Sequence, residues 1–264
     1  MAVSEEHALS KKLPVIEIFG PTIQGEGVVI GQQTYFVRMG GCDYRCTMCD
    51  SLHAVLPELI KKNASWQTQQ EMAYNILLAM NENSSPWLTI SGGNPCIHEM
   101  GHFVQLMHDA GKLIHVETQG TIYPEWLNDV DMLTCSPKGP GMGEITDINN
   151  LDEFLRRAYE EDIGPDALKV VVFDQRDLDF ARQIFRRYWD MGIIVPSQCY
   201  LSLGNSLPPS VDGETLGMSH TEHMEKLLAD YRSLAEDIMV DPILSKVVFL
   251  PQWHVFVWGN AQGH

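Results

Sequence analysis

The stretch Thr34-Tyr-Phe-Val-Arg-Met-Gly-Gly-Cys-Asp-Tyr-Arg-Cys-Thr-Met-Cys-Asp50 joins an apolar segment to a cluster of cysteines. Its first part, residues 34–39, is rich in aromatic and β-branched side chains and predicts a buried strand. Two glycines end that strand, and a polar, cysteine-rich loop follows. Parallel α/β folds place their ligand-binding groups in this way, at the carboxyl ends of strands. The stretch therefore predicts both an α/β fold and the position of its functional site.

Other short apolar runs repeat along the chain and predict further strands. They cover residues 15–19, 87–91, 113–117, 132–135, 168–173, 199–203 and 246–250. Amphipathic stretches separate them, and nearly continuous apolar strands between helices indicate a parallel sheet that is buried on both faces. About six such repeats favour an open or closed barrel over a flat nucleotide-binding sheet. Periodicity alone does not separate these two arrangements.

Capping signals mark the ends of several amphipathic stretches. Thr68 with Glu71, and Ser219 with Glu222, match the capping box that begins a helix. Gly111 is placed as a glycine that ends a helix. These signals predict helices between the strands.

Polar or glycine-rich residues follow four of the predicted strands. These segments are residues 38–50, 91–95, 117–120 and 136–138. Residues 138–150 and 204–218 are rich in Gly, Pro and Asp or Asn and predict loops, which at this length are often functional. Residues 52–66 give no clear prediction. We expect the polar strand ends to meet in one site.

Composition and charge exclude several classes of protein. Hydrophobic residues make up 44% of the 264 positions, enough to bury a substantial core in a single domain over residues 1–264. No apolar run approaches the ~20 residues that cross a bilayer, and the first residues lack the apolar core of a secretion signal. Eighteen Lys and Arg against 35 Asp and Glu give a formal charge of −17, which disfavours binding to nucleic acid. We expect a soluble, cytoplasmic protein that binds neither nucleic acid nor membrane.

Three cysteines, Cys42, Cys46 and Cys49, lie within eight residues. Thiolates at this spacing can ligate three irons of a 4Fe-4S cluster and leave the fourth iron open. Zinc is the alternative metal at this site. It usually takes four protein ligands, and His53 is available as the fourth. The isolated cysteines are predicted to be inert buried residues: Cys96, Cys135 and Cys199.

The spacing Cys-x3-Cys-x2-Cys resembles the signature of the radical S-adenosylmethionine superfamily, in which the open iron chelates the amino and carboxylate groups of that cofactor. Superfamily members usually have an aromatic residue before the third cysteine, where this chain has Met48. They also have a Gly-Gly-Glu-Pro turn that holds the cofactor's amino group, and here the turn reads Gly92-Gly93-Asn94-Pro95. Because backbone carbonyls carry that contact, we expect Asn94 in place of Glu to be tolerated, and glycine lets the chain approach the ligand closely.

Further blocks closely resemble the 7-carboxy-7-deazaguanine synthases, a family within this superfamily. The first are Phe19-Gly-Pro-Thr-Ile-Gln-Gly-Glu-Gly27 and Phe36-Val-Arg38. The resemblance continues in matching order over residues 90–95, 117–121, 136–138, 169–172, 250–254 and 258–260. The short spacing between the first two cysteines matches one branch of the family.

The resemblance implies a reaction, a fold and partners. The reaction converts 6-carboxy-5,6,7,8-tetrahydropterin to 7-carboxy-7-deazaguanine with loss of ammonia, in 7-deazapurine (queuosine) biosynthesis. An electron from the reduced cluster would cleave S-adenosylmethionine, and the 5′-deoxyadenosyl radical would take hydrogen from C6 of the pterin. The implied fold is an incomplete TIM-like barrel of about six parallel strands with peripheral helices. A reductant such as flavodoxin or ferredoxin and a homodimer are also implied, with residues 1–33 contributing to substrate binding and 245–264 closing the site.

By the same resemblance, a set of residues near the cluster binds S-adenosylmethionine. The set is Met48, Gly92, Gly93, Glu117, Ser136, Pro137 and Lys138. Lys138 would meet the methionyl carboxylate or the ribose edge of the cofactor. Glu117 would hold a ribose hydroxyl or the ammonium group, unless it only pairs with Lys138.

A second set is implied to bind the pterin. It consists of Ile23, Gln24, Gly25, Glu26, Arg38, Ser91, His254 and Asn260. Gln24 offers a donor and an acceptor, and Glu26 can accept from the N–H groups of the pyrimidine edge. Arg38 can clamp the substrate carboxylate with paired hydrogen bonds, or instead form a structural ion pair with Glu26 or Asp43. His254 is equally compatible with an ordinary packed histidine.

Family members use a magnesium ion near the substrate carboxylate, and a hydroxyl residue two positions after the third cysteine ligates it. Ser51 occupies that position. Magnesium prefers oxygen ligands in octahedral geometry, which a hydroxyl with substrate and water oxygens can provide. The alternative role for Ser51 is to cap a helix.

Two other functions stay open at this point. A glycyl-radical activase shares the cysteine spacing, although the Gln-Gly-Glu-Gly block and the Trp258-Gly-Asn260 ending oppose it. A non-enzymatic iron–sulfur or zinc module is the other, although a carrier would have four protein ligands to its cluster, and this chain clusters only three thiols.

Overall fold

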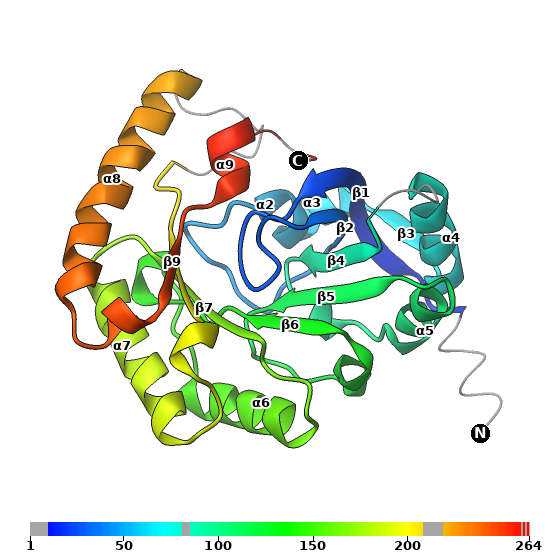
Figure 1. Ribbon diagram of the computed structural model, residues 1–264. Helices are drawn as coiled ribbons and strands as arrows, with labels where there is room; N and C mark the ends of the chain where they lie inside the picture. The colour runs from blue at the N-terminus through cyan, green and yellow to red at the C-terminus, as the bar shows by residue number, and fades with distance from the viewer. Residues whose placement is uncertain (1–9, 81–84, 208–218, 260, 262, 264) are drawn as a thin grey trace.

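The computed structural model describes residues 10–80, 85–207, 219–259, 261 and 263. Within these residues, nine strands form one open sheet in the order β3-β1-β2-β4-β5-β6-β7-β8-β9 (Figure 1). The strands are β1 Leu13–Ile23, β2 Gln33–Met39, β3 Ser65–Gln67, β4 Trp87–Gly92, β5 Leu113–Thr118, β6 Met132–Cys135, β7 Ala167–Val172, β8 Cys199–Leu203 and β9 Val248–Leu250. The order and the covering helices give a partial TIM-like barrel, and the predicted α/β class is confirmed.

Helices connect most of the parallel strands. The α-helices are α2 Leu52–Val55, α3 Pro57–Asn63, α4 Gln69–Ala79, α5 Gly101–Asp109, α6 Ile148–Glu160, α7 Gln175–Asp190, α8 His220–Val240 and α9 Trp253–Trp258. Short 3₁₀ turns are η1 Pro95–Ile97, η2 Glu125–Asp129, η3 Pro140–Met142, η4 Pro196–Gln198 and η5 Leu244–Lys246. None of the helices in the described residues is both long and apolar enough to cross a membrane.

The sheet is mixed rather than wholly parallel. From β2 to β9 each neighbouring pair is parallel, whereas β1 pairs antiparallel with both β2 and β3. The prediction of a parallel sheet is wrong for β1, because residues 24–32 between β1 and β2 are too few for a crossover helix. The unassigned segment 52–66 holds α2, α3 and the start of β3.

The predicted capping signals are present in the structure. Thr68 with Glu71 caps α4, and Ser219 with Glu222 caps α8, each as a reciprocal capping box. Gly111 follows α5 at a φ of +70°, a left-handed conformation that glycine adopts without a steric penalty. The loop predicted at 138–150 contains η3 and the first turn of α6. The loop predicted at 204–218 lies within the described residues only as far as residue 207.

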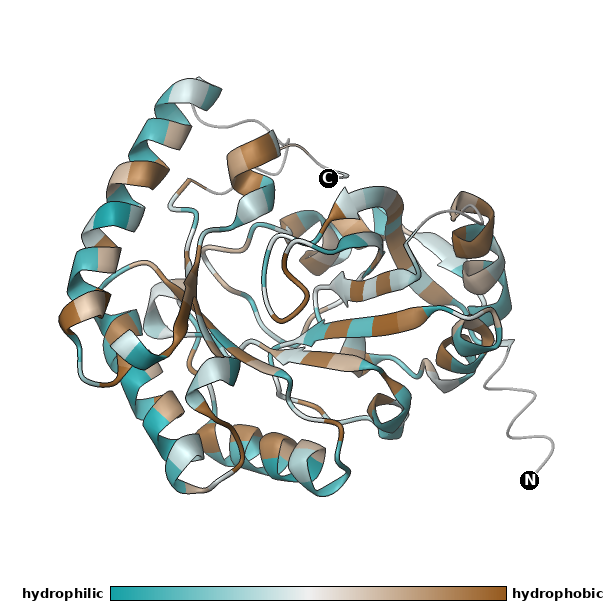
Figure 2. Cartoon of the chain, viewed as in Figure 1, coloured by the Kyte–Doolittle hydropathy of each residue, from teal (hydrophilic) through white to brown (hydrophobic). Residues whose placement is uncertain are grey.

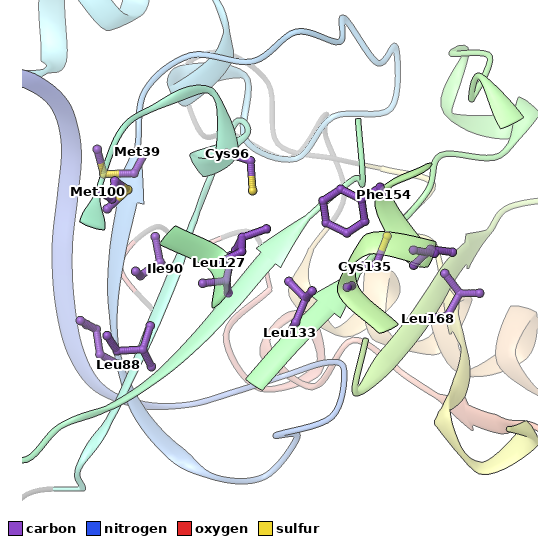
Figure 3. Packing of buried hydrophobic residues seen from close by; sticks show 14 of the residues in the cluster. Met39, Leu88, Ile90, Cys96, Met100, Leu127, Leu133, Cys135, Phe154 and Leu168 are labelled. Atoms are coloured by element: carbon purple, nitrogen blue, oxygen red, sulfur yellow. The ribbon is translucent and has the colours of Figure 1, made fainter. Parts of the chain in front are cut away.

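Alternate side chains of the strands face two different environments. Met39, Leu88 and Ile90 are fully buried and pack in one large apolar cluster with residues of the covering helices. Figure 3 shows part of this layer, where they lie near Met100 and Leu127. The strand residues between them are often polar, and Figure 2 shows brown bands that alternate with pale bands along β4 and with teal bands along β5. The inner surface of the sheet is therefore available for polar chemistry.

A ladder of buried polar groups crosses the inner surface of the sheet. Thr34 Oγ1 lies 3.0 Å from Thr89 Oγ1, which lies 3.4 Å from His115 Nδ1. His115 Nε2 lies 2.8 Å from Thr134 Oγ1. Burial lowers the pKa of His115 to about 3, so its imidazole is neutral. The ladder satisfies polar groups from four adjacent strands in an otherwise dry interior.

A small second apolar cluster fixes the C-terminal segment. Leu203, Leu227 and Val255 bury against one another and join the end of β8 to α8 and α9. Tyr231 of α8 stacks on Phe249 of β9 with ring centroids 4.3 Å apart. This packing holds the beginning of α9 over the carboxyl ends of the strands.

Candidate active site

A cavity of about 220 Å³ lies where the carboxyl ends of the strands meet. Its lining comes from strands β1, β2, β4, β5 and β7 and from the segments that follow β6, β8 and β9. Of the residues that the sequence predicted, these line the cavity: Ile23, Gln24, Gly25, Glu26, Arg38, Met48, Ser51, Ser91, Gly92, Gly93, Glu117, Ser136, Lys138 and His254. The fold thus gathers residues that are more than 200 positions apart in the chain, and a cavity in this place is typical of parallel barrels.

The three clustered cysteines lie on the loop after β2, beside the cavity. Each is a free, half-buried thiol. Backbone N–H groups point at two of them, since Tyr44 N donates to Cys42 Sγ at 3.4 Å and Ser51 N donates to Cys49 Sγ at 3.4 Å. Burial raises the pKa of Cys46 to about 11 and of Cys49 to about 12, so a thiolate there needs a cationic partner. Three thiols on one loop with N–H donors to sulfur fit a 4Fe-4S cluster.

Among the described residues no group of three or more His, Cys, Asp and Glu side chains is arranged to hold a single metal ion, so His53 does not complete a zinc site with the cysteines. Its Nε2 is 3.4 Å from Glu17 Oε1, on the first strand. The isolated cysteines behave as the sequence predicted, since Cys96, Cys135 and Cys199 are buried.

The glycine turn after β4 approaches the cysteine loop without space for side chains. A Cβ on Gly92 would lie 2.1 Å from Met39 O, and a Cβ on Gly93 would lie 2.2 Å from Gly41 O. Gly92 also has a φ of +142°. Only glycine fits at these two positions. Both half-buried glycines line the cavity, as expected of a turn that holds a ligand through backbone atoms.

Asn94, the departure from the Gly-Gly-Glu-Pro pattern, is fully buried. Its Nδ2 donates to Asp43 Oδ1 at 2.8 Å, and its Oδ1 accepts from Thr118 Oγ1 at 2.9 Å. The side chain therefore has a structural role that the expectation of simple tolerance did not include.

The Ser-Pro-Lys segment after β6 lies on one wall of the cavity. Lys138 Nζ donates to Ser136 Oγ at 3.3 Å, and Lys138 N donates to Thr146 Oγ1 at 3.0 Å. Pro137 between them is buried and does not line the cavity. The possible ion pair of Lys138 with Glu117 is absent from the described contacts, because Glu117 Oε1 instead accepts from Gln24 Nε2 at 3.3 Å.

A buried ion pair also lines the cavity, with its lysine on the neighbouring strand β7. Lys169 Nζ of β7 donates to Glu26 Oε2 at 3.0 Å, and both side chains are almost fully buried. Although burial raises it, the Lys169 ammonium and His254 lower the pKa of Glu26 to about 2. Burial raises the pKa of Glu117 above its ordinary value. The surroundings therefore shift these two cavity carboxyl groups in opposite directions, Glu26 toward the ionised form and Glu117 toward the neutral form.

Arg38 pairs with a residue that the sequence did not predict. Its Nε donates to Glu17 Oε1, and its guanidinium also donates to Ser51 Oγ at 3.2 Å. The suggested partners Glu26 and Asp43 were wrong, because β1 runs antiparallel to β2 and its register sets Glu17 beside Arg38. Although burial raises the pKa of Glu17, His53 and Arg38 together hold it below its ordinary value.

The C-terminal segment closes over the N-terminal one. Trp253 N donates to Gly25 O at 3.2 Å, and a Cβ on Gly25 would lie 2.5 Å from His254 Nδ1. Gly25 therefore has no side chain because His254 occupies that space. His254 lines the cavity, and Asn260 lies outside the described residues.

Several cavity residues were not predicted as site residues. They include Glu17, Phe19, Phe36, Lys169 and Asn205, and His53, which the sequence offered only as a zinc ligand, lines the cavity as well. Phe19 and Phe36 stack with centroids 4.9 Å apart and form an apolar wall. Lys169 had a signal in the sequence, because a lysine inside an apolar strand is almost never buried without a partner.

Comparison with known proteins decides the family. The 4Fe-4S single cluster domain family matches residues 23–134. The 7-carboxy-7-deazaguanine synthase of Bacillus subtilis is 38% identical over 97% of this chain and 100% of its own length. The corresponding synthase of Bacillus cereus is 36% identical over 96% of this chain and 99% of its own length.

The chain belongs to the 7-carboxy-7-deazaguanine synthase family. This confirms the resemblance that the motifs indicated, and with it a radical S-adenosylmethionine enzyme with an iron–sulfur cluster. The match extends over nearly the whole chain and not only over the cysteine loop, which sets aside the zinc module, the electron carrier and the activase.

Solved structures support the fold. QueE from Escherichia coli superposes with a TM-score of 0.58 at 19% identity, covering 91% of this chain and 94% of that one. SuiB from Streptococcus suis, in a complex with its precursor peptide SuiA, superposes with a TM-score of 0.52 at 11% identity, covering 80% of this chain and 46% of that one. At such low identity these likenesses establish the architecture that this family member shares with them.

Proposed function

We propose that this protein converts 6-carboxy-5,6,7,8-tetrahydropterin to 7-carboxy-7-deazaguanine with release of ammonia, the reaction after which its family is named. One observation carries the proposal. A single cavity is lined by Ser136 and Lys138, which match the cofactor-binding motif, and by Gln24, Glu26 and Arg38, whose chemistry suits an anionic pterin. The two ligands would thus be held side by side.

The cysteine loop and the glycine turn form the cofactor side of the proposed site. Cys42, Cys46 and Cys49 would hold the 4Fe-4S cluster, whose reduced form supplies the electron that cleaves S-adenosylmethionine. Backbone atoms of Gly92 and Gly93 would bind the cofactor's amino group. Met48, Glu117, Ser136 and Lys138 line the rest of this side, and the buried Pro137 joins Ser136 to Lys138. The walls keep bulk water from a reactive radical.

Gln24, Glu26 and Arg38 form the substrate side of the proposed site. Glu26 Oε1 and Ser91 Oγ are buried atoms without a hydrogen-bond partner among the described residues. Such atoms are costly unless a ligand satisfies them. Arg38 donates to Glu17 and Ser51 and keeps further N–H groups for a substrate carboxylate, since a guanidinium has five.

Magnesium binding at Ser51 is part of the proposal. Ser51 begins α2, but its hydroxyl makes no capping hydrogen bond. It donates to Asp50 Oδ1 at 3.0 Å, and both residues line the cavity. A hydroxyl beside a carboxylate is the kind of hard oxygen donor set that magnesium prefers. The ion would displace Arg38 from the serine oxygen.

The proposal extends to partners and location. We expect a flavodoxin or ferredoxin as reductant, a homodimer and a cytoplasmic location. Sedimentation of the reconstituted protein would test the expected homodimer, and a species of twice the mass of one chain is the expected result.

Anaerobic reconstitution followed by a turnover assay tests the function. The protein would be incubated with S-adenosylmethionine, dithionite, magnesium and 6-carboxy-5,6,7,8-tetrahydropterin, and the products identified by mass spectrometry. We expect 7-carboxy-7-deazaguanine and ammonia in equal amounts. Formation of 5′-deoxyadenosine without any deazaguanine product would leave a radical enzyme with a different substrate and would overturn the proposal.

A further inference from the structure

Lys169 and Glu26 lie on different parts of the fold and meet in the cavity wall. Lys169 belongs to β7 and Glu26 to the segment between β1 and β2, yet Nζ and Oε2 are 3.0 Å apart. Their side chains are only 6% and 11% exposed. A buried ion pair usually gives no more stability than apolar residues of the same size. Its position at the cavity therefore calls for a reason other than stability.

The segment that carries Glu26 is held rigidly from both sides. Gln24 Oε1 accepts from Gly25 N at 2.7 Å and from Glu26 N at 3.3 Å. Gln24 N and Gly31 N complete the turn through bonds to Gln32 O and Gln24 O, each of 2.9 Å. The position of the Glu26 carboxylate is therefore fixed before any ligand arrives, as a selective site requires.

The ion pair leaves hydrogen-bonding capacity toward the cavity. Glu26 Oε1 has no hydrogen-bond partner of good geometry among the described residues. The nearby Ser202 hydroxyl, which is also buried without such a partner, helps to lower the pKa of Glu26. Lys169 Nζ has Glu26 as its hydrogen-bond partner in the described part of the chain, and an ammonium group has three N–H donors. The pair thus presents an acceptor and a donor side by side.

We propose that Lys169 and Glu26 form a preformed donor–acceptor pair that binds the amide edge of the pterin ring. Lys169 donates to the C4 carbonyl oxygen, and Glu26 accepts from the adjacent ring N–H. This inference rests on the proposed function, and it makes Lys169 a specificity-determining residue. A ring with the opposite order of donor and acceptor on this edge would meet two repulsive contacts and bind weakly.

Two stable pterin analogues provide the test. 6-Carboxypterin carries the C4 carbonyl and the ring N–H, whereas 2,4-diaminopteridine-6-carboxylate carries an amino group at C4 and a bare ring nitrogen. Both keep the carboxylate and the 2-amino group, so they differ only at the edge in question. Their affinities would be measured by anaerobic calorimetry on the reconstituted enzyme with S-adenosylmethionine, at a pH where neither ring is protonated.

We expect the wild-type enzyme to prefer 6-carboxypterin by about tenfold or more, because a site with fixed polar partners strongly rejects the wrong pattern. Lys169→Met should remove most of that preference. Since this variant leaves a buried carboxylate without its counter-ion, Glu26→Gln combined with Lys169→Met serves as a charge-neutral second variant with the same expected loss. Arg182→Met, which removes the cation from the distant ion pair with Asp241, is the matched control and should keep the preference.

Three results are distinguishable. Loss of the preference in the Lys169 variants that fold, with the preference kept in Arg182→Met, supports the inference. An equal preference in wild type and variants, or no preference in wild type, would make Lys169 a structural residue and overturn the inference while the proposed function stands. Failure of wild type to bind either analogue and to turn over the pterin would overturn the proposed function and this inference with it.

Discussion

Asn94 Nδ2 donates to Asp43 Oδ1 at 2.8 Å, and this bond ties the glycine turn after β4 to the cysteine loop after β2. Asn94 N adds a second tie, a hydrogen bond to Gly41 O of 2.8 Å. Gln119 Nε2 reaches the same carboxylate oxygen at 2.6 Å and Cys42 Sγ at 3.5 Å. One carboxylate thus joins the turn, the loop and the end of β5.

The pairing of Asn94 with Asp43 predicts the result of restoring the superfamily's usual glutamate. Asn94→Glu would place a carboxylate against Asp43 and lose the donated hydrogen bond, so we expect a loss of about 2 kcal/mol or more in the free energy of unfolding. The iron content of the variant after reconstitution should also be lower than that of wild type, because the bond between residues 94 and 43 ties the glycine turn to the cysteine loop. Denaturant unfolding and iron analysis measure the two effects.

Asp43→Asn in the Asn94→Glu background is the matching control. The new amide can donate to the new carboxylate, so a large part of the lost stability and iron should return. Additive effects of the two changes would show that the residues are not coupled.

Much of the fold was accessible from the sequence because local signals and tertiary structure agree. Residues 34–39 are rich in aromatic and β-branched side chains and are followed by two glycines, and the structure has β2 at Gln33–Met39. The capping box at Thr68 and the glycine at 111 act within one turn of chain, so their outcome needs no knowledge of distant residues.

The missing parts depend on contacts between distant residues. The three residues of β3 are too short to give a periodic signal, and they are a strand only because they pair with β1. Glu17 pairs with Arg38 because of the antiparallel register of β1 and β2. That register cannot be predicted from the sequence of either strand alone. Lys169 stands out as a lysine inside an apolar run that predicted the strand correctly, but its partner Glu26 lies 143 positions away in the chain, so the pairing could not be predicted.

Loss of a single clustered cysteine should abolish the cluster. We expect Cys46→Ala to lack the brown absorption of a 4Fe-4S cluster after reconstitution, because a loop with two thiolates leaves two irons without protein ligands. Cys199→Ala should keep the cluster, because within the described residues this sulfur accepts from Trp189 Nε1 at 3.1 Å and donates to a backbone carbonyl. Full iron and sulfide content in Cys46→Ala would contradict the assignment.

Arg38 is expected to act on substrate binding more than on cofactor cleavage. Arg38→Ala should weaken pterin binding by about 2–5 kcal/mol, because it removes charge-assisted contacts in a desolvated site. Formation of 5′-deoxyadenosine in the absence of pterin should change little. Calorimetry and product analysis measure the two quantities separately.

Glu17→Gln is the control for a structural role of Arg38. It removes the ion-pair partner and leaves the guanidinium in place. If Arg38 only holds Glu17, the two variants should lose pterin affinity equally, whereas a direct contact predicts a much larger loss in Arg38→Ala.

His115 should make the folded protein sensitive to mild acid. The unfolded chain takes up a proton at this imidazole below about pH 6.5, whereas burial lowers the pKa of His115 in the folded protein to about 3. Stability is therefore lost as the pH falls from the first value toward the second, by about 2 kcal/mol between pH 7 and pH 5. His115→Gln lacks this imidazole. Urea unfolding should therefore show that the free energy of unfolding falls by about 2 kcal/mol more in wild type than in the variant between pH 7 and pH 5. Parallel losses in the two proteins would contradict the neutral buried imidazole.

Ser51 provides the test of magnesium binding. Ser51→Ala should keep the cluster and still bind S-adenosylmethionine, because the described hydroxyl contacts are with Asp50 and Arg38 and not with the cysteine sulfurs. Turnover should fall and respond weakly to added magnesium, because the ion would orient the pterin carboxylate and stabilise charge during ring contraction. Ser51→Thr keeps the oxygen at the same branch point and should retain activity. The measurement is turnover against magnesium concentration for the three proteins at saturating substrate, and wild-type activation in Ser51→Ala would mean that the ion is held elsewhere or is not used.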